Sequence, residues 1–338
     1  MTYIHFVTTI VTENPFLRCL PSSLVRNCEL MPDKRFLLVI ATFIVSALLP
    51  SPAYAADSTM FDYILVISAE NHGLNEVFPA MPYMTSLANT YGLSTQYTTS
   101  IVPSLPNYLA LFSGQTWGCD GYDGLPNSNN CTDKAWNSTN ANLVDRLEAK
   151  GITWKAYMED MPSNCYTDNI GNYAVRHNPF VYFSDIATNQ SRCEKVVPAG
   201  VNDITLLNDL RSTETASNFM WLTPNLCNGM HDCSVGTGDK YLSELVPKIL
   251  SSNVFMTQKA VIFLFFDEPG SGGSQIYAAW VGPAAKKAYQ SAKSYTHYSF
   301  LKTVEANWGL PNITSNDGNA LAMTEFFGDN HNYEVTVS

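Results

Sequence analysis

Short apolar runs recur along the chain at intervals that are typical of a sheet with alternating helices. The run YILVIS at 63–68 is rich in β-branched residues and shows no polar alternation. This pattern predicts a strand that is buried on both faces of a parallel sheet. Similar runs predict further strands at 153–158, 218–222, 260–266 and 276–281.

Segments with a helical period separate these runs. The clearest lies at 239–252, where apolar residues recur on one face of a helix. Pro247 falls inside this segment, which predicts a kink there or a helix that starts later. Further helices are predicted at 81–91, 105–113, 141–150 and 297–308.

Strands that alternate with helices predict an α/β fold, with a mostly parallel central sheet flanked by helices on both faces. In such folds ligands bind beyond the carboxyl ends of the strands. The stretch 114–138 is rich in Gly, Asn, Asp and Ser and holds two cysteines. We interpret it as a disulfide-stapled surface loop or cap within a single domain at 56–338.

Residues 1–55 predict a leader and signal peptide. Basic residues at 34–35 precede the apolar run 36–49, and a small-residue cleavage site ends at Ala55. The run is shorter than the roughly 20 residues that cross a bilayer, so a retained anchor is the weaker alternative. Met31 as the true start is a further alternative. We expect a secreted, cell-surface or periplasmic protein with no stable membrane span after cleavage.

Charge and cysteine content limit which classes of partner and which cellular compartment the chain is expected to have. The net charge of −11 argues against nucleic acid as a partner. The even number of cysteines beyond the leader predicts disulfides in an exported chain, and no C-x-x-C spacing supports the alternative of a zinc site. Several connectivities are open. Pairing of neighbours is preferred: Cys119–Cys131, Cys165–Cys193 and Cys227–Cys233.

Acidic side chains follow two of the predicted strands directly. Glu70 and Asn71 come after the first strand, and Asp267 and Glu268 come after the strand at 260–266. Because the carboxyl ends of neighbouring parallel strands meet at one edge, we expect these side chains to converge. Carboxylates that lie close together favour a hard divalent cation. The alternative is that acidic residues follow strands because they begin turns.

A serine lies at the start of a predicted helix. In SIVPSLPNYLALFSG at 100–114, two prolines predict a tight turn and the following residues a helix. Ser104 therefore lies at or just before a helix amino terminus, which favours anions. Its hydroxyl is a candidate nucleophile, and Asn107 is a candidate donor to a phosphoryl oxygen. The alternative is that Ser104 only caps the helix.

Histidines lie beside predicted turns or acidic residues. The candidates are His177, His231 with its neighbour Asp232, and His297. Such histidines can bind metal, hold phosphate or protonate a leaving group. A lone histidine is more often a structural residue, and that alternative stays open for each.

Seven motifs together are specific in their order and spacing. They are ENH at 70–72, PSLPNYLALFSG at 103–114, HNPF at 177–180, MHDC at 230–233, YLSELVPKIL at 241–250, FDE at 266–268 and YTHYSFLKTVE at 295–305. They resemble the secreted phosphoesterases that unite bacterial acid phosphatases with phospholipases C, a branch of the alkaline phosphatase superfamily. The resemblance covers nearly all of 56–338.

The resemblance implies a secreted acid phosphatase in which Ser104 attacks a phosphate monoester and forms a phosphoseryl intermediate. It implies catalytic roles for Ser104, His177, His231 and Asp232, beside the candidate Asn107. The implied cofactor is a divalent ion, Ca, Mg or Zn. The implied substrate is a small phosphate ester, with a phosphoinositide or another phospholipid head group among the options. Residues expected to hold the metal are Glu70, Asn71, Ser104, Asp267, Glu268 and His297.

Three other functions stay open at this point. A phospholipase C or other phosphodiesterase could use the same site, but those enzymes typically begin with ENRSFDHYFG, whereas 70–79 here reads ENHGLNEVFP. This departure favours the acid phosphatase branch, which includes phosphoinositide phosphatases. A non-catalytic secreted surface-binding protein is the alternative of another class. An inactive member of the family is the third.

Overall fold

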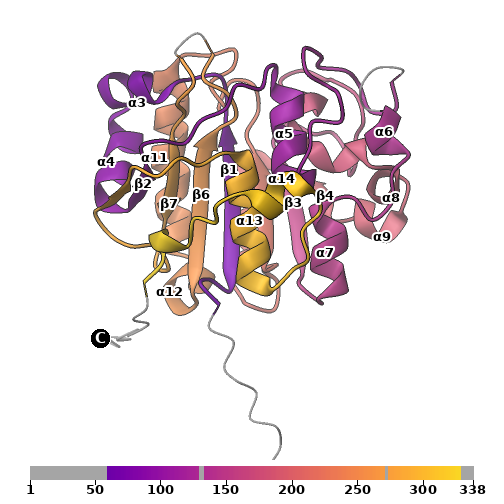
Figure 1. Cartoon of the computed structure of the whole chain (residues 1–338). Helices are drawn as coiled ribbons and strands as arrows, with labels where there is room; N and C mark the ends of the chain where they lie inside the picture. Colours follow the sequence, from indigo (N-terminus) through magenta and orange to yellow (C-terminus); the bar gives the residue numbers. More distant parts are fainter. Residues whose placement is uncertain (1–58, 129–132, 271–272, 329–338) are drawn as a thin grey trace, which may run out of the picture. The chain divides into compact units, whose positions relative to one another are not determined.

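The computed structural model describes residues 59–128, 133–270 and 273–328. The predicted leader at 1–55, with Met31, lies outside them and stays a prediction. Within the described residues one sheet of eight strands runs in the order β4-β3-β5-β1-β6-β7-β2-β8 (Figure 1). The strands are β1 Tyr63–Ala69, β2 Gly92–Ser94, β3 Trp154–Met158, β4 Val196–Pro198, β5 Phe219–Thr223, β6 Ala260–Phe266, β7 Ala278–Val281 and β8 Tyr289–Ser291.

The sheet is mostly parallel. Only β7 is antiparallel to its neighbours, β6 and β2, among the strands that the structure describes. The five predicted strands are present as β1, β3, β5, β6 and β7, which confirms the α/β fold. The sequence did not predict β2, β4 and β8, because strands of three residues carry too few side chains to show a period.

Helices and short 3-10 turns connect the strands. The α-helices are α3 Leu74–Ala80, α4 Pro82–Thr90, α5 Ser104–Ser113, α6 Asp133–Trp136, α7 Leu143–Ala149, α8 Ser184–Ala187, α9 Gln190–Cys193, α10 Ile204–Asp209, α11 Val235–Leu250, α12 Asn253–Thr257, α13 His297–Trp308 and α14 Ser315–Asn319. The 3-10 turns are η1 Val175–His177, η2 Pro179–Tyr182, η3 Val201–Asp203 and η4 Thr324–Phe326.

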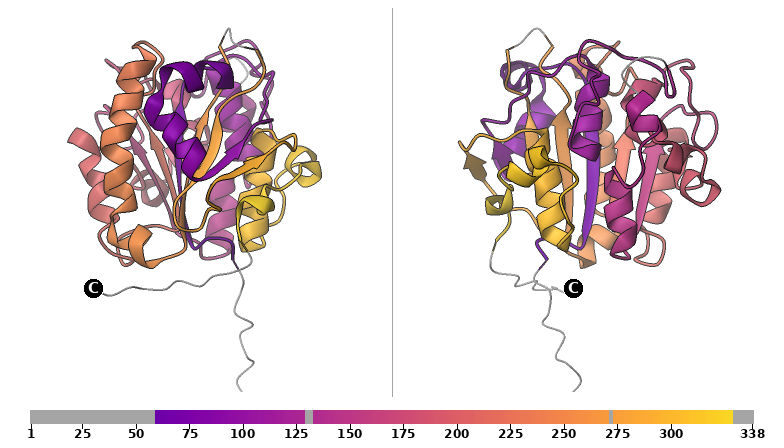
Figure 2. Two further views of the ribbon diagram at one scale, coloured as in Figure 1. Left: turned by 90° about the vertical axis from the view of Figure 1, so that its left-hand side faces the viewer. Right: turned by 45° about the vertical axis from the view of Figure 1, so that its right-hand side comes forward.

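Helices cover both faces of the sheet, as predicted. Figure 2 shows α11 on one side of the strands and α5 with α13 on the other. The predicted helix around Pro247 does not start later but earlier, at Val235, because the Ser234 side chain caps it by accepting from the Thr237 N–H. Pro247 lies in the last turn of α11.

The middle of the sheet is the apolar core that fixes the strand ends. All seven residues of β6 are buried, and so is β1 from Ile64 onward. Phe263 of β6 packs against Trp280 and Phe300, with ring centroids 4.6 and 4.7 Å apart. This packing holds β1 and β6 in place, so the residues that follow them have defined positions.

Two of the three preferred disulfides are confirmed. Cys165 pairs with Cys193, and Cys227 pairs with Cys233. Cys131 lies outside the described residues, as does part of the predicted stapled loop at 114–138, so the pairing with Cys119 stays a prediction. No helix of the described part is long and apolar enough to cross a membrane.

Candidate active site

Two neighbouring strands end side by side and bring acidic residues together. β1 and β6 pair in parallel, with Ala69 opposite Phe266. Glu70 and Asp267 come next, and the Asp267 N–H donates to the Ala69 carbonyl at 3.0 Å. The two carboxyl groups interact, and each affects the pKa of the other. The predicted convergence at the carboxyl edge is therefore present.

The Asp267 carboxylate organises the loops at this edge. Its Oδ1 accepts from the backbone N–H groups of Asn71, at 3.2 Å, and Glu268, at 2.7 Å. Asn71 has a left-handed φ of 62°. Gly270 lies so close to it that a Cβ there would be 2.4 Å from the Asn71 carbonyl oxygen. The turn that carries Asn71 therefore needs a glycine at position 270.

The acidic side chains of the site are held in a protein environment that disfavours charge. Burial, and then the charge of Asp267, raises the pKa of Glu70 well above its usual range. Burial raises the pKa of Asp267 to about 6, although hydrogen bonds from its neighbours act in the opposite direction. Burial, Asp267 and Asp123 raise the pKa of Glu268 to about 8. Such groups take up a proton or a cation.

Ser104 is the first residue of α5 and points at this edge. The cap position belongs to Pro103, which follows a cis peptide bond, so the alternative that Ser104 is only an N-cap is wrong. The Ser104 side chain is 2% exposed, and its hydroxyl donates to Glu70 Oε2 at 3.3 Å. The hydroxyl also lies close enough to Asp267 to lower the pKa of that carboxyl.

Glu70 has two further partners. The Tyr108 hydroxyl donates a short hydrogen bond to Glu70 Oε1, one turn after Ser104 on α5. His177 Nε2 lies 3.3 Å from Glu70 Oε2, a contact distance without hydrogen-bond alignment. The His177 ring stacks on Tyr108 with centroids 5.4 Å apart. Burial and then the nearby Arg176 hold the pKa of His177 well below its usual range.

Asn107 does not face the substrate side in the way predicted. Its amide donates to the carbonyls of Ile101, at 2.9 Å, and Pro103, at 3.0 Å, so both donor hydrogens are used. Its Oδ1 accepts from Thr99 Oγ1 at 2.9 Å. Asn107 therefore shapes the loop that leads to Ser104, and the predicted donation to a phosphoryl oxygen is absent here.

His297, expected to bind metal, also has a positioning role. Its Nε2 is 2.8 Å from the Asp267 carbonyl and 3.0 Å from Asn107 Oδ1, while Nδ1 is 3.2 Å from the Tyr97 hydroxyl. Both acceptors at Nε2 require a hydrogen there, so neither ring nitrogen is available to a metal. Burial lowers the pKa of His297 to about 4, which keeps the ring neutral.

His231 and Asp232 lie at the rim of the site. His231 Nδ1 is 2.6 Å from Asp232 Oδ1, and its Nε2 is 3.0 Å from Arg176 Nη2. The rings of His231 and His177 lie 5.7 Å apart. The disulfide Cys227–Cys233 closes this loop. The predicted pair thus reaches the same cleft, with the Asp232 side chain 57% exposed.

Oxygen atoms at this edge fit a hard divalent cation. Asp267 Oδ2, Asn71 Oδ1 and Glu268 Oε2 are buried and have no well-aligned partner among the described residues. The Ser104 hydroxyl is a further oxygen beside them. In the part of the chain that the structure describes, no three His, Cys, Asp or Glu side chains cluster closely enough to hold an ion. Amide and hydroxyl oxygens would therefore complete the ligand set.

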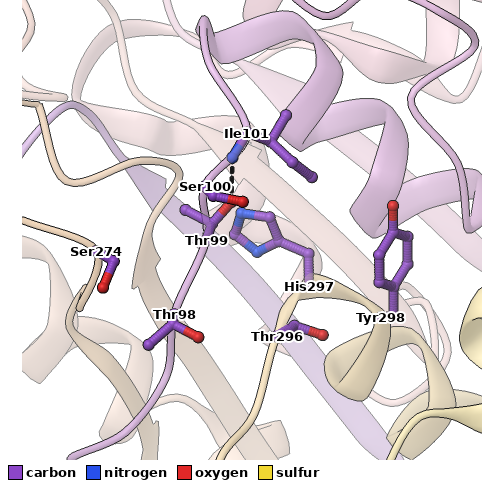
Figure 3. Close-up of a pocket in the computed structure, with 8 residues that line it drawn as sticks. All are labelled: Thr98, Thr99, Ser100, Ile101, Ser274, Thr296, His297 and Tyr298. Atoms are coloured by element: carbon purple, nitrogen blue, oxygen red, sulfur yellow. Dashed lines mark hydrogen bonds between the residues drawn. The ribbon is translucent and has the colours of Figure 1, made fainter.

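A cavity of about 420 Å³ lies beside His297. Figure 3 shows its walls, formed by the segment 98–101 that leads to Ser104, by Ser274 and by the segment 296–298. Most of the side chains that line it carry hydroxyl groups, and only the neutral His297 can become charged at moderate pH. The cavity therefore suits a polar, uncharged group.

Sequence reasoning missed three residues of the site, Tyr108, Arg176 and Asp123. Tyr108 had a signal, because it lies four residues after Ser104 and shares its helix face. Arg176 stands next to His177 in the quoted HNPF motif. Asp123 lies in an irregular stretch whose pattern gives no information about where it folds.

Comparison with known proteins identifies the family of the chain. Residues 78–311 match the model of the Phosphoesterase family, so the chain belongs to this family. The matched range contains Ser104, Asp267 and Glu268 and begins just after Glu70 and Asn71. The predicted resemblance to phosphoesterases is confirmed.

Curated relatives carry phosphatase names. The chain is 30% identical over 280 residues to an acid phosphatase of Aspergillus fumigatus. The matched residues cover 78% of this chain and 58% of the relative. It is 30% identical over 308 residues to a phosphate-repressible acid phosphatase of Penicillium chrysogenum, covering 87% and 70%. It is 29% identical over 273 residues to a phosphatidylinositol-3-phosphatase of Mycobacterium tuberculosis, covering 80% and 84%. The chain thus spans little more than half of the Aspergillus fumigatus relative.

Solved structures share the fold at low identity. A Vibrio parahaemolyticus protein of the alkaline phosphatase superfamily has a TM-score of 0.53 at 12% identity, covering 86% of this chain and 80% of its own. Murine ectonucleotide pyrophosphatase/phosphodiesterase 5 has a TM-score of 0.53 at 8% identity, covering 79% and 100%. These similarities confirm the fold alone.

Proposed function

We propose that the protein is an acid phosphatase that hydrolyses phosphate monoesters with Ser104 as its nucleophile. The observation that carries this proposal is the buried Ser104 hydroxyl, which lies at the amino end of α5 and donates to Glu70 beside Asp267. A helix amino terminus favours an anion, and a carboxylate beside a hydroxyl can hold its proton. Membership of the Phosphoesterase family and the phosphatase names of the relatives support the reaction class.

We propose a divalent cation as cofactor, held by oxygen atoms of Glu70, Asn71, Ser104, Asp267 and Glu268. The buried oxygens without aligned partners among the described residues support this set. A hard cation of the calcium or magnesium type fits oxygen ligands better than zinc does. When bound, such an ion neutralises charge on the phosphoryl group and favours the ionised serine.

Different residues of the chain then carry out the individual steps of the reaction. Glu70 Oε2 accepts the Ser104 proton while Oγ bonds to phosphorus and the ester oxygen leaves as the alcohol. His231, oriented by Asp232 at Nδ1, supplies the proton to that alcohol. Water next attacks phosphorus and gives a proton to the same histidine; the Oγ–P bond breaks, phosphate is released, and Glu70 returns its proton to Ser104 Oγ. Tyr108 keeps Glu70 oriented throughout, through its hydrogen bond to Oε1.

The substrate is proposed from the relatives and from the cavity. The relative from Mycobacterium tuberculosis is a phosphatidylinositol-3-phosphatase. A cavity lined by hydroxyl groups beside the loop that leads to Ser104 would suit a polyhydroxylated alcohol such as an inositol. We therefore propose a small phosphate ester, with phosphoinositides as one class to be tested. The disulfides support an exported protein.

A substitution of the nucleophile tests the proposal. Ser104→Ala should lower turnover of p-nitrophenyl phosphate by at least ~10³-fold with an unchanged thermal melt, because the covalent route is lost. Ser113→Ala, at the far end of α5, is the matched control. Acid-quenched enzyme with labelled substrate should carry phosphate on Ser104 in the wild type and none in Ser104→Ala.

The choice between phosphatase and phosphodiesterase needs a separate comparison. Wild-type protein should hydrolyse p-nitrophenyl phosphate faster than bis(p-nitrophenyl) phosphate and p-nitrophenyl phosphocholine. Faster cleavage of either diester would replace the monoesterase proposal by a phosphodiesterase. Near wild-type activity of Ser104→Ala would reject Ser104 as the nucleophile.

A further inference from the structure

A carboxylate outside the predicted site, that of Asp123, lies between the start of α5 and Arg176. Asp123 lies in the irregular segment between α5 and α6. Its Oδ1 accepts from the Leu105 backbone N–H, in the first turn of α5, at 3.0 Å. Its Oδ2 lies 3.4 Å from Nε of Arg176. An N–H at a helix start and a guanidinium are the two kinds of donor that bind phosphoryl oxygens.

Arg176 has a hydrogen-bond donor that is not used in the described part of the chain. Its Nη2 donates to His231, but its buried Nε has no aligned hydrogen-bond partner in the described part of the chain. The guanidinium lies next to the site, because Arg176 directly precedes His177 and its Nη2 is 3.0 Å from Nε2 of His231. A guanidinium with an unused donor is available to a further ligand.

A second buried nitrogen near this position belongs to His177. His177 is 2% exposed, and no described residue aligns with its Nε2, which lies beside Glu70. With the buried Nε of Arg176, this gives two nitrogen atoms that have no aligned partner in the described ranges. Buried atoms of this kind usually have a partner, so together they indicate a ligand between α5 and η1.

We propose that Asp123 is an internal stand-in for the substrate phosphoryl group, and that Arg176 binds a phosphoryl oxygen once Asp123 has moved away. This inference rests on the proposed phosphatase function. Two anions cannot share the same donors, because like charges at hydrogen-bond distance repel each other. The substrate must therefore displace Asp123, and Arg176 exchanges one anion for the other.

Exchange of one anion for the other at Arg176 would change the hydrogen bonding of His231. Because a guanidinium only donates, Nε2 of His231 must accept from Arg176 and cannot carry a proton in this arrangement. When Arg176 turns to the phosphoryl group, Nε2 is released and can take a proton, supported by Asp232 at Nδ1. Binding of the anion thus prepares the acid that the leaving alcohol needs.

Arg176 also gives a reason for a preference among substrates. A phosphate monoester carries up to two negative charges on its phosphoryl group, and a diester carries one. A cation that contacts the phosphoryl oxygens stabilises the first more than the second. Arg176 is therefore proposed as a residue that determines specificity for monoesters.

The test measures how tightly inorganic phosphate competes with p-nitrophenyl phosphate. Asp123→Asn keeps an acceptor for the Leu105 N–H but removes the charge, and Asp123→Ala removes both. We expect both variants to bind phosphate about tenfold more tightly, the lower end of what a hydrogen bond to a charged group contributes. Asp120→Asn, an exposed acid of the same segment, is the control and should match the wild type.

A second set of variants tests the partner. Arg176→Gln should weaken phosphate binding and lower monoester turnover more than diester turnover, and Asp123→Asn should give no gain in the Arg176→Gln background if the two side chains act as a pair. Wild-type or weaker phosphate binding by Asp123→Asn, with normal wild-type activity, would overturn the inference while leaving the phosphatase function intact. Absence of phosphatase activity in the wild type would instead remove the proposed function.

Discussion

Two clusters of buried carboxyl groups in the described part of the chain differ in what surrounds them. One lies at the carboxyl edge of the sheet, around Glu70 and Asp267. The other lies where α13 meets α14, formed by Glu305 and Asp317. In both, at least one carboxyl is buried enough to raise its pKa to about 6 or higher. Burial of acid alone therefore does not mark the active site.

In the second cluster the backbone satisfies Asp317, whereas both carboxyl oxygens of Glu305 are buried without an aligned partner among the described residues. Asp317 accepts from the N–H groups of Ile313, at 2.8 Å, and Thr314, at 2.9 Å, and caps the start of α14. Thr314 in turn donates to the carbonyl of Gly114, which ends α5, at 2.9 Å. Glu305 is 1% exposed and lies against Asp317. This cluster joins the far end of α5 to the C-terminal helices.

The first cluster faces side chains that can react. A hydroxyl, a phenol and an imidazole, from Ser104, Tyr108 and His177, contact Glu70. Asp267 has two backbone donors, as Asp317 does, but keeps one oxygen without an aligned partner among the described residues. Unused carboxyl oxygens occur in both clusters, so reactive neighbours, rather than burial or unused oxygens, distinguish a catalytic acid from a structural one.

Neutralising one acid of each cluster should give the largest difference in effect between the two clusters. Asp267→Asn should lower phosphatase turnover at least ~100-fold, because even indirect partners of a metal ligand typically contribute 10–100-fold. Asp317→Asn should instead lower the free energy of unfolding by about 1–3 kcal/mol through its backbone hydrogen bonds and leave turnover near the wild type. Turnover with p-nitrophenyl phosphate and urea unfolding measure the two effects.

Metal dependence should separate the same two variants. Exhaustive chelation should abolish the activity of wild type and Asp317→Asn, and added divalent ion should restore it. Asp267→Asn should recover little activity when the divalent ion is added. Activity that survives chelation in the wild type would contradict the proposed cofactor, and equal losses in both variants would contradict the distinction between the clusters.

A smaller effect is expected from the phenol beside Glu70. Tyr108→Phe removes only the hydroxyl that bonds to Glu70 Oε1 and keeps the ring that stacks on His177. Metal affinity or activity should fall about 10–100-fold, the range for groups that orient a metal ligand. Tyr182→Phe, whose hydroxyl bonds to the Gly124 carbonyl, is a matched control. An unchanged metal titration for Tyr108→Phe would reduce its role to packing.

Much of this arrangement could be predicted because it follows from the order of residues along strands and helices. The buried runs of β1 and β6 fix where Glu70 and Asp267 lie, and the prolines on either side of Ser104, Pro103 and Pro106, place it at a helix start. Hydrogen-bond partners could not be predicted in this way. Periodicity gives the face of a helix but not the atoms that a side chain meets, so the bonds of the Asn107 amide to the Ile101 and Pro103 carbonyls could not be predicted.

Residues from irregular segments could not be placed at all. Asp123 and Arg176 come from loops without a repeating pattern, and their meeting depends on how α5 and η1 pack. The Glu305–Asp317 contact has the same origin, since the short helix α14 has to fold back onto α13. The sequence shows that such residues are polar, while only the tertiary structure shows which of them share a site.

The smallest predicted effect concerns Glu305 and the dependence of stability on pH. Burial, and then Asp317, raises the pKa of Glu305 to about 8 from a usual value of 4.5. Between these values the folded protein holds a proton that the unfolded chain has lost, so this group makes the protein less stable as the pH rises from about 4.5 to about 8. The melting temperature should fall across this range, by about 2–4 °C for each kcal/mol of stability that this group loses. Glu305→Gln resembles the protonated form and should remove that part of the slope. Lys302→Gln, at a half-buried neighbour on α13 whose charge lowers the pKa of Glu305, should keep this slope and make it slightly steeper. Identical slopes for wild type and Glu305→Gln would show that the second cluster holds no extra proton, and burial alone would then not raise the pKa of an acid in this fold.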